Sequence, residues 1–220
     1  MGGEPWTRAA QRRTAGFEPV RRVPVFALGF AASMLAADMA VTHLLPGGRP
    51  EAVRSFGISL DALLRGEAWR AVTATMLVHD QGMLLRQLAL SLLAIGLYER
   101  RVGTARAAGM FWTTDLLGTA ILFGGIVWPY AAFVDPATPF GATHDVGMSG
   151  GGFGILGALA HDLGGRRRRM VLAGGLAALG AMALRGGDPI ADALHLVTFG
   201  LGYVGAGLLA SRRGANLAKR

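Results

Sequence analysis

The chain has 220 residues, of which 52% are hydrophobic and 16% are charged, and its formal net charge is +8. Long apolar stretches separate clusters of basic residues, which is typical of an integral membrane protein rather than a soluble domain. Basic clusters that flank apolar spans meet anionic lipid, so we expect a bilayer and no nucleic acid as partner. The chain has no cysteine, which excludes disulfides, iron–sulfur clusters and thiolate zinc sites.

Six apolar segments predict an all-α integral membrane bundle that forms one domain over residues 24–210. The first segment is long enough to span a membrane and too long for a secretory signal. Residues 1–23 and 211–220 are polar and predict cytoplasmic tails. The predicted spans are 24–45, about 81–98, 105–128, 147–163, 170–184 and 190–210.

The segment between the first two spans, residues 46–80, is too polar to cross a membrane and too apolar for a free loop. It predicts an interfacial first external loop with short helices. Asp38 lies within the first span, and we expect its carboxyl group to face the protein interior because charge is costly in lipid.

The basic residues orient the predicted spans. They gather in the segments predicted to be inside, such as Arg166 to Arg169, and are fewer in the outside loops. This bias follows the positive-inside rule and places both termini in the cytoplasm. Lys219 is the only lysine, and all other basic residues of the Lys/Arg type are arginines. This usage hints at a GC-rich bacterial source. We therefore expect a multi-pass protein of a bacterial cell membrane.

A serine among glycines, Ser149, and the histidine of the last span, His195, are the candidate nucleophile and base. Counted from the cytoplasmic ends of their helices, Ser149 lies about 25 Å deep and His195 about 24 Å deep. Met83 and Gln87 of the second span lie at about 25 and 20 Å. All four fall several ångströms below the outer surface of a hydrocarbon core about 30 Å thick. Polar groups at one depth predict a water-filled cavity.

A helix that begins at Ser149 is short, so it must begin inside the membrane, at the floor of that cavity. Its first backbone N–H groups are unpaired and lie at the positive end of the helix dipole, which suits an oxyanion. Two rows of small residues let the fourth and sixth helices approach closely, so that Ser149 and His195 come within hydrogen-bond reach. The rows are Gly150, Gly154 and Ala158, and Thr198, Gly202 and Ala206.

Structural interpretations of the same residues remain open. Ser149 alone is explained as a helix cap, and His195 as a hydrogen-bonded interior histidine. The match of residues 147–151 to the Gly-x-Ser-x-Gly elbow of soluble hydrolases fails because no strand precedes it. Asp192 lies one turn outward of His195 and either orients its ring, caps the helix or is solvated.

The embedded charges Asp115 and Arg86 predict an interior ion pair between neighbouring spans. The remaining histidines and carboxylates lack the spacing of metal ligands, so we expect no metal and no cofactor.

Together these residues resemble the rhomboid intramembrane serine proteases over residues 24–210. Gly147-x-Ser149-Gly150 is similar to the catalytic Gly-x-Ser-Gly of that family, and His195 to its catalytic histidine. Phe153 falls where an aromatic ring packs against the histidine. Two further motifs match, one in the first external loop and one at the end of the second span: Glu67-x-Trp69-Arg70 and Glu99-x-x-x-Gly103.

The resemblance implies a Ser149–His195 dyad without an acid, which cleaves transmembrane proteins near their outer ends. It also implies that Gly150 and Gln87 help to hold the oxyanion. The chain departs from the family at Met83-x-x-x-Gln87, where His-x-x-x-Asn is usual. Gln87 keeps an amide donor, but Met83 cannot donate. Losing one oxyanion donor typically costs about 100- to 1000-fold in rate.

The sequence therefore predicts an intramembrane serine endopeptidase, a hydrolase, with transmembrane proteins as substrates. The alternatives are a weak or inactive rhomboid-like protein that binds transmembrane helices, favoured by Met83 at the place of a donor, and a small-molecule transporter. No polar path crosses the cytoplasmic halves of the spans, which argues against transport. The oligomeric state stays open.

Overall fold

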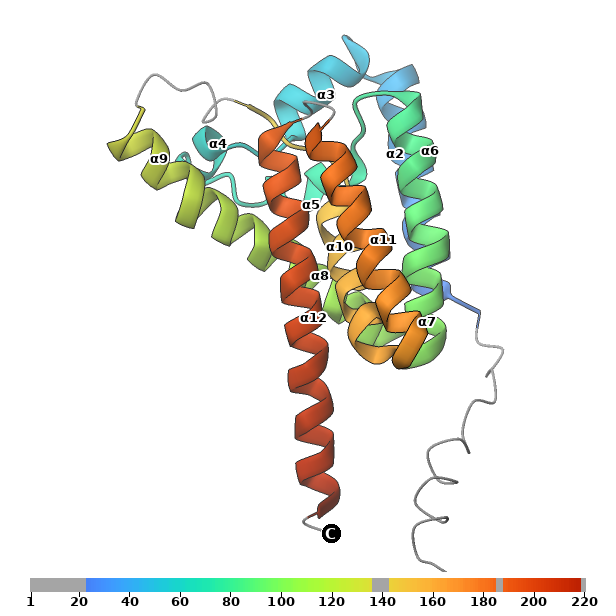
Figure 1. Ribbon diagram of the computed structural model, residues 1–220. Helices are drawn as coiled ribbons and strands as arrows, with labels where there is room; N and C mark the ends of the chain where they lie inside the picture. The colour runs from blue at the N-terminus through green and yellow to red at the C-terminus, as the bar shows by residue number, and fades with distance from the viewer. Residues whose placement is uncertain (1–22, 136–142, 185–187, 219–220) are drawn as a thin grey trace, which may run out of the picture.

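The computed structural model describes residues 23–135, 143–184 and 188–218, which form helices and no β-strand (Figure 1). The predicted N-terminal tail lies outside the described residues, apart from Val23. The elements are α2 (Val25–Leu44), α3 (Gly48–Phe56), α4 (Leu60–Leu64), α5 (Arg70–Thr73), the 3₁₀ turn η1 (Ala74–Met76), α6 (Gln81–Leu90), the π-helical turn η2 (Ser91–Ile95), α7 (Gly96–Val102), α8 (Thr104–Leu122), the π-helical turn η3 (Phe123–Val127), α9 (Trp128–Phe133), α10 (Ser149–Asp162), α11 (Gly165–Leu184) and α12 (Pro189–Ala218).

Four helical segments of the described chain are long and apolar enough to cross a membrane: Val25–Leu44, Gln81–Val102, Thr104–Phe133 and Pro189–Ser211. The protein is therefore an all-α membrane protein. Two of the six predicted spans, 147–163 and 170–184, are not among these four. The first corresponds to α10, which has only 14 residues, or about 21 Å of helix. The second corresponds to α11, which begins with four arginines.

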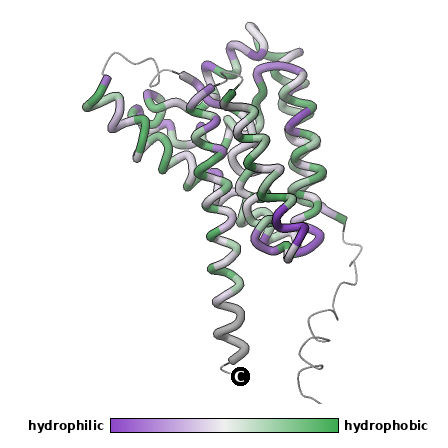
Figure 2. Tube along the Cα trace, in the orientation of Figure 1, coloured by the Kyte–Doolittle hydropathy of each residue, from purple (hydrophilic) through white to green (hydrophobic). Residues whose placement is uncertain are grey.

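The short helix α10 forms the centre of the bundle, where it packs against α8, α11 and α12 (Figure 1). Almost all of its residues from Gly150 to Ala160 are buried. The polar turn between α10 and α11 lies at the same end of the bundle as the end of α7, whereas α3 and α4 lie at the opposite end (Figure 2). The helices thus alternate in direction. Helix α12 continues to Ala218, into the segment predicted as the C-terminal tail.

Glycines let the backbones of α10 and α12 touch. A Cβ atom at Gly202 would overlap the carbonyl oxygen of Gly154, and one at Gly157 would overlap that of Phe199. The predicted close approach of the two small-residue rows is confirmed at Gly154 and Gly202. Thr198, by contrast, faces Gly118 of α8. The small-residue row of α12 therefore packs against α8 as well as α10.

Glu99, from the motif at the end of the second span, caps a different helix. Its two carboxyl oxygens accept the N–H groups of Phe26 and Ala27, each at 2.9 Å, in the first turn of α2. Thr104 Oγ1 donates a third hydrogen bond at 2.6 Å. Gly103 has a φ of 89°, a left-handed value that favours glycine and lets α8 begin directly after α7. The motif therefore joins α2, α7 and α8.

Residues 46–80, predicted as the first external loop, fold into short helices, as predicted. Arg70 is buried, and its Nη1 donates to the carbonyl oxygens of Arg54 and Gly57 at 2.8 and 3.3 Å. Its Nε lies 2.6 Å from Glu67 Oε2, and its guanidinium carbon lies 5.4 Å from the centre of the Trp69 ring. The Glu67-x-Trp69-Arg70 motif thus holds the loop in shape.

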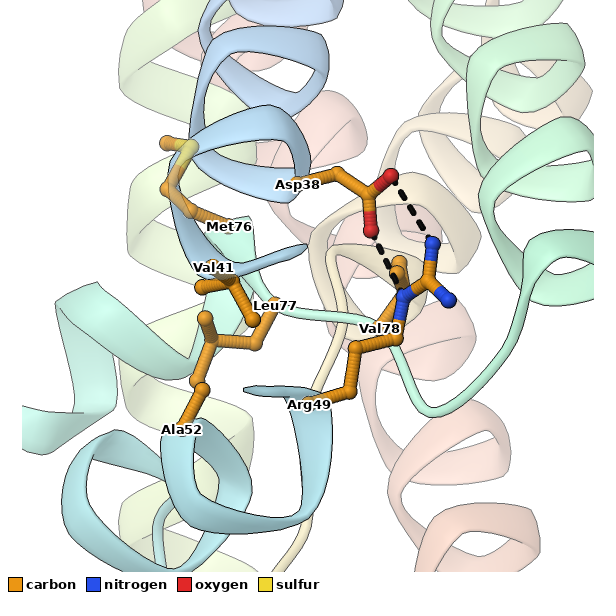
Figure 3. Close-up of a pocket in the computed structure, with 7 residues that line it drawn as sticks. All are labelled: Asp38, Val41, Arg49, Ala52, Met76, Leu77 and Val78. Atoms are coloured by element: carbon orange, nitrogen blue, oxygen red, sulfur yellow. Dashed lines mark hydrogen bonds and ion pairs between the residues drawn. The ribbon is translucent and has the colours of Figure 1, made fainter. Parts of the chain in front are cut away.

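The predicted inward orientation of Asp38 is also present, since its side chain is only 11% exposed. Arg49 of α3 donates two hydrogen bonds to the Asp38 carboxylate, at 2.8 and 3.0 Å, beside a small pocket (Figure 3). The same guanidinium reaches Gln81 Oε1 at 2.9 Å. One arginine therefore links α2, α3 and the start of α6.

The contact between α10 and α12 predicts a sharp difference between two glycines on one helix. Gly202→Ala should lower stability by about 1–3 kcal/mol, because a methyl group must be forced into a close-packed backbone contact. Gly200→Ala is the matched control, because a Cβ atom there has nothing within 4 Å. Thermal unfolding of the purified protein in detergent would measure both variants. Equal melting temperatures for the two variants would contradict the packing described above.

Candidate active site

Backbone hydrogen bonds hold the loop before α10 against the segment of residues 46–80. Ile58 N donates to Asp145 O at 3.0 Å, and Asp145 N donates to Ile58 O at 2.7 Å. Gly147 N donates to Ala74 O at 2.8 Å. Gly147 has a φ of 107°, which favours glycine. These contacts fix the direction in which the chain enters α10 at Ser149.

Ser149 and His195 form a direct hydrogen bond across the contact between α10 and α12. The distance from Ser149 Oγ to His195 Nε2 is 2.8 Å. Ser149 is partly exposed, whereas His195 is only 3% exposed. The Phe153 ring stacks on the imidazole at 4.4 Å between centroids and 25° between planes. The geometry predicted for these three residues is present, and the stacking holds the imidazole plane toward the serine.

Among the described residues, no carboxylate orients the imidazole from its other side. His195 Nδ1 is buried and has no hydrogen-bond partner among the described residues. The predicted options of orienting the ring or capping the helix are both wrong for Asp192. The cap is Asp188, whose Oδ1 accepts from Ile190 N at 2.8 Å and from Ala191 N at 3.4 Å. The pair is therefore a Ser–His dyad in geometry.

The first turn of α10 leaves two adjacent backbone N–H groups unpaired. Met148 N donates to Gln87 Oε1 at 3.1 Å, Gly151 N to Asp115 Oδ1 at 2.7 Å, and Gly152 N to Met148 O at 2.9 Å. Within the described ranges, no acceptor lies opposite the N–H groups of Ser149 and Gly150. Free N–H groups beside a serine hydroxyl form a ready site for a negatively charged oxygen.

Gln87 and Met83, the other candidate oxyanion positions, both lie against Gly147. A Cβ atom on Gly147 would overlap Gln87 Nε2 and would lie 2.6 Å from Met83 Cε. Since Gln87 Oε1 already accepts from Met148, its Nε2 is the free end of the amide, and it donates to no described residue. Gln87 is 4% exposed and Met83 is partly exposed. An amide donor is thus present beside Gly147, and the other candidate position, Met83, carries a thioether, which cannot donate.

The predicted ion pair between Arg86 and Asp115 is wrong. Arg86 is exposed on α6, where its guanidinium lies near Asp80, while Asp115 is 3% exposed and accepts from Gly151. The spacing of charges in the sequence does not show which face of each helix they occupy. In the described part of the chain, no three histidines or carboxylates gather into a metal site.

No protein-family model matches this chain, and no curated protein matches it.

The loop before α10 carries a titratable group with a marked pKa shift. Burial, with the nearby charges of Asp188 and Asp115, raises the pKa of Asp145 to about 7 from an unfolded value of 3.8. A raised pKa means that the folded state favours the protonated acid, so its stabilising effect is full below pH 3.8 and is lost as pH rises through about 7.

Asp145→Asn, which stays neutral, should therefore gain melting temperature relative to the wild type as pH rises from about 4 to about 7. Above about pH 8 the difference should stay constant, because the wild-type carboxyl is then ionised in both states. Thermal unfolding in matched detergent buffers across this range would measure it. A difference that does not change with pH would show that Asp145 titrates normally in the folded protein.

Proposed function

We propose that this protein is an intramembrane serine endopeptidase, similar to the rhomboid proteases, that cleaves transmembrane protein substrates with a Ser149–His195 dyad. The observation that carries the proposal is the 2.8 Å hydrogen bond between Ser149 Oγ and His195 Nε2. Its position at the start of a buried helix, beside two free N–H groups, supports a nucleophile rather than a helix cap.

Each group has a role in the proposed reaction. Ser149 Oγ attacks the scissile carbonyl carbon, while His195 Nε2 takes the hydroxyl proton and later returns it to the leaving amine. The N–H groups of Ser149 and Gly150, with Gln87 Nε2, donate to the developing oxyanion. Water then attacks the acyl-enzyme with His195 as its base, and Ser149 is released.

The proposed setting is a six-span rhomboid-like bundle in the cell membrane of a bacterium, with both termini in the cytoplasm. Four apolar helices support a membrane location. In this setting α10 need not cross the whole bilayer, because its first residue lies at the floor of a cavity that opens outward. Substrate helices enter the bundle sideways from the lipid and are cleaved near their outer ends.

The second candidate is a weak or inactive rhomboid-like protein that binds transmembrane helices. One observation favours it: Met83 Cε lies beside Gly147, next to the Gln87 amide, where a second donor would serve an oxyanion. The intact hydrogen bond between Ser149 and His195 favours the protease.

A fluorophosphonate probe separates the two candidates, because it reacts only with an activated serine. Membranes that contain the wild-type protein should label, and the adduct should map to Ser149 by mass spectrometry. Ser149→Ala and His195→Ala should abolish labelling, and Ser211→Ala, which changes an exposed serine on α12, should leave it unchanged. Absence of wild-type labelling beside a labelled active protease would overturn the proposal in favour of the helix-binding protein.

A further inference from the structure

Asp115 is a buried carboxyl group that the proposed reaction does not use. It lies in the interior of α8 and is 3% exposed. Among the described residues it has no cationic partner, and its one hydrogen bond is the 2.7 Å contact with Gly151 N–H. Burying a carboxyl group in an apolar helix bundle is costly, so the position calls for an explanation.

The contact falls on the turn that holds the nucleophile. Gly151 is the third residue of α10, two residues after Ser149. Asp115 Oδ1 also lies against Gly150, since a Cβ atom there would be 2.6 Å from it. The carboxyl group therefore touches the two glycines that follow Ser149, from a helix that contributes nothing to the dyad.

The hydrogen bond determines where the backbone ladder of α10 begins. The first backbone bond of the helix runs from Gly152 N to Met148 O. One residue earlier, Gly151 N–H would turn toward Gly147 O if it had no other acceptor, since that is the regular helical partner. Asp115 takes this N–H, and Gln87 takes that of Met148. The two side chains thus bracket the N–H groups of Ser149 and Gly150 and leave both free.

We propose that Asp115 is a positioning residue for the reaction at Ser149. By accepting Gly151 N–H, it fixes Ser149 as the first residue of α10 and keeps the free N–H groups of Ser149 and Gly150 directed at the oxyanion. The inference rests on the proposed protease function, but the local geometry that it concerns is measurable without activity.

Three substitutions separate positioning from packing. Asp115→Asn keeps an acceptor oxygen for Gly151 N–H, whereas Asp115→Leu keeps the branched shape without an acceptor. Asp115→Ala replaces the leucine variant if that variant does not fold. The matched control is Thr114→Val, because Thr114 is buried on the same helix, packs against Gly154 and donates only to the carbonyls of its own helix.

The first readout is the maximal rate of inactivation by the fluorophosphonate, measured on folded protein and separated from probe affinity. Asp115→Leu and Asp115→Ala should react about 10- to 100-fold more slowly, as expected when reacting groups are misplaced by about 1 Å. Asp115→Asn should react close to the wild-type rate. Thr114→Val should lose melting temperature with no change in rate. Leucine and alanine variants that react at the wild-type rate would overturn the proposal.

The second readout is amide hydrogen exchange of the peptide that covers residues 147–152. Exchange should differ between Asp115→Leu and the wild type, because Gly151 N–H loses its side-chain acceptor and changes partner, and Asp115→Asn should keep the wild-type exchange. If the wild type does not label at all, the protease function fails and this exchange alone decides the role of Asp115. Exchange that is the same in all variants would show that Asp115 does not fix the start of α10.

Discussion

The site depends on one contact, the backbone-to-backbone packing of α10 against α12. Gly154 and Gly202 let the two helices approach until backbone atoms touch, and such contacts are stiff because protein interiors are close-packed. The contact fixes both the relative depth and the rotation of the helices. Ser149 precedes Gly154 by about one and a half helical turns, and His195 precedes Gly202 by about two turns, so their 2.8 Å hydrogen bond follows from the packing.

The hydrogen bonds at the start of α10 also determine which backbone N–H groups are free. A helix normally begins with four unpaired N–H groups, which solvent or loop atoms would satisfy without selectivity. Here side chains from α6 and α8 take the donors on either side, at Met148 and Gly151, and the pinned loop fixes Gly147. As a result, the donors that remain free are the two beside the serine hydroxyl.

Helix geometry explains what the sequence could predict. Counting 1.5 Å per residue from basic helix ends placed Ser149 and His195 at one depth, and four-residue spacing of small residues indicated the close contact. Glycine at 147 and the stacking position of Phe153 followed from the motif. These features depend on distance along one helix, which a sequence states directly.

The features that sequence failed to predict depend on rotation about helix axes. Arg86 and Asp115 lie on helix faces that do not meet, and the N-cap of α12 is Asp188 rather than Asp192. Gly157, outside the predicted row, proved to be a second point of backbone contact. Hydropathy alone also could not predict how many helices are long enough to cross a membrane. Helix α10 is enclosed by protein, so it needs neither full length nor uniform apolarity.

The most direct measurement is a structure of the protein with a fluorophosphonate bound to Ser149, whose phosphoryl oxygen imitates the oxyanion. We expect that oxygen to lie about 2.7–3.1 Å from the N–H nitrogens of both Ser149 and Gly150, with His195 Nε2 still beside Ser149 Oγ. An adduct whose oxygen points away from both N–H groups would contradict the account, because the free donors would then serve no charge.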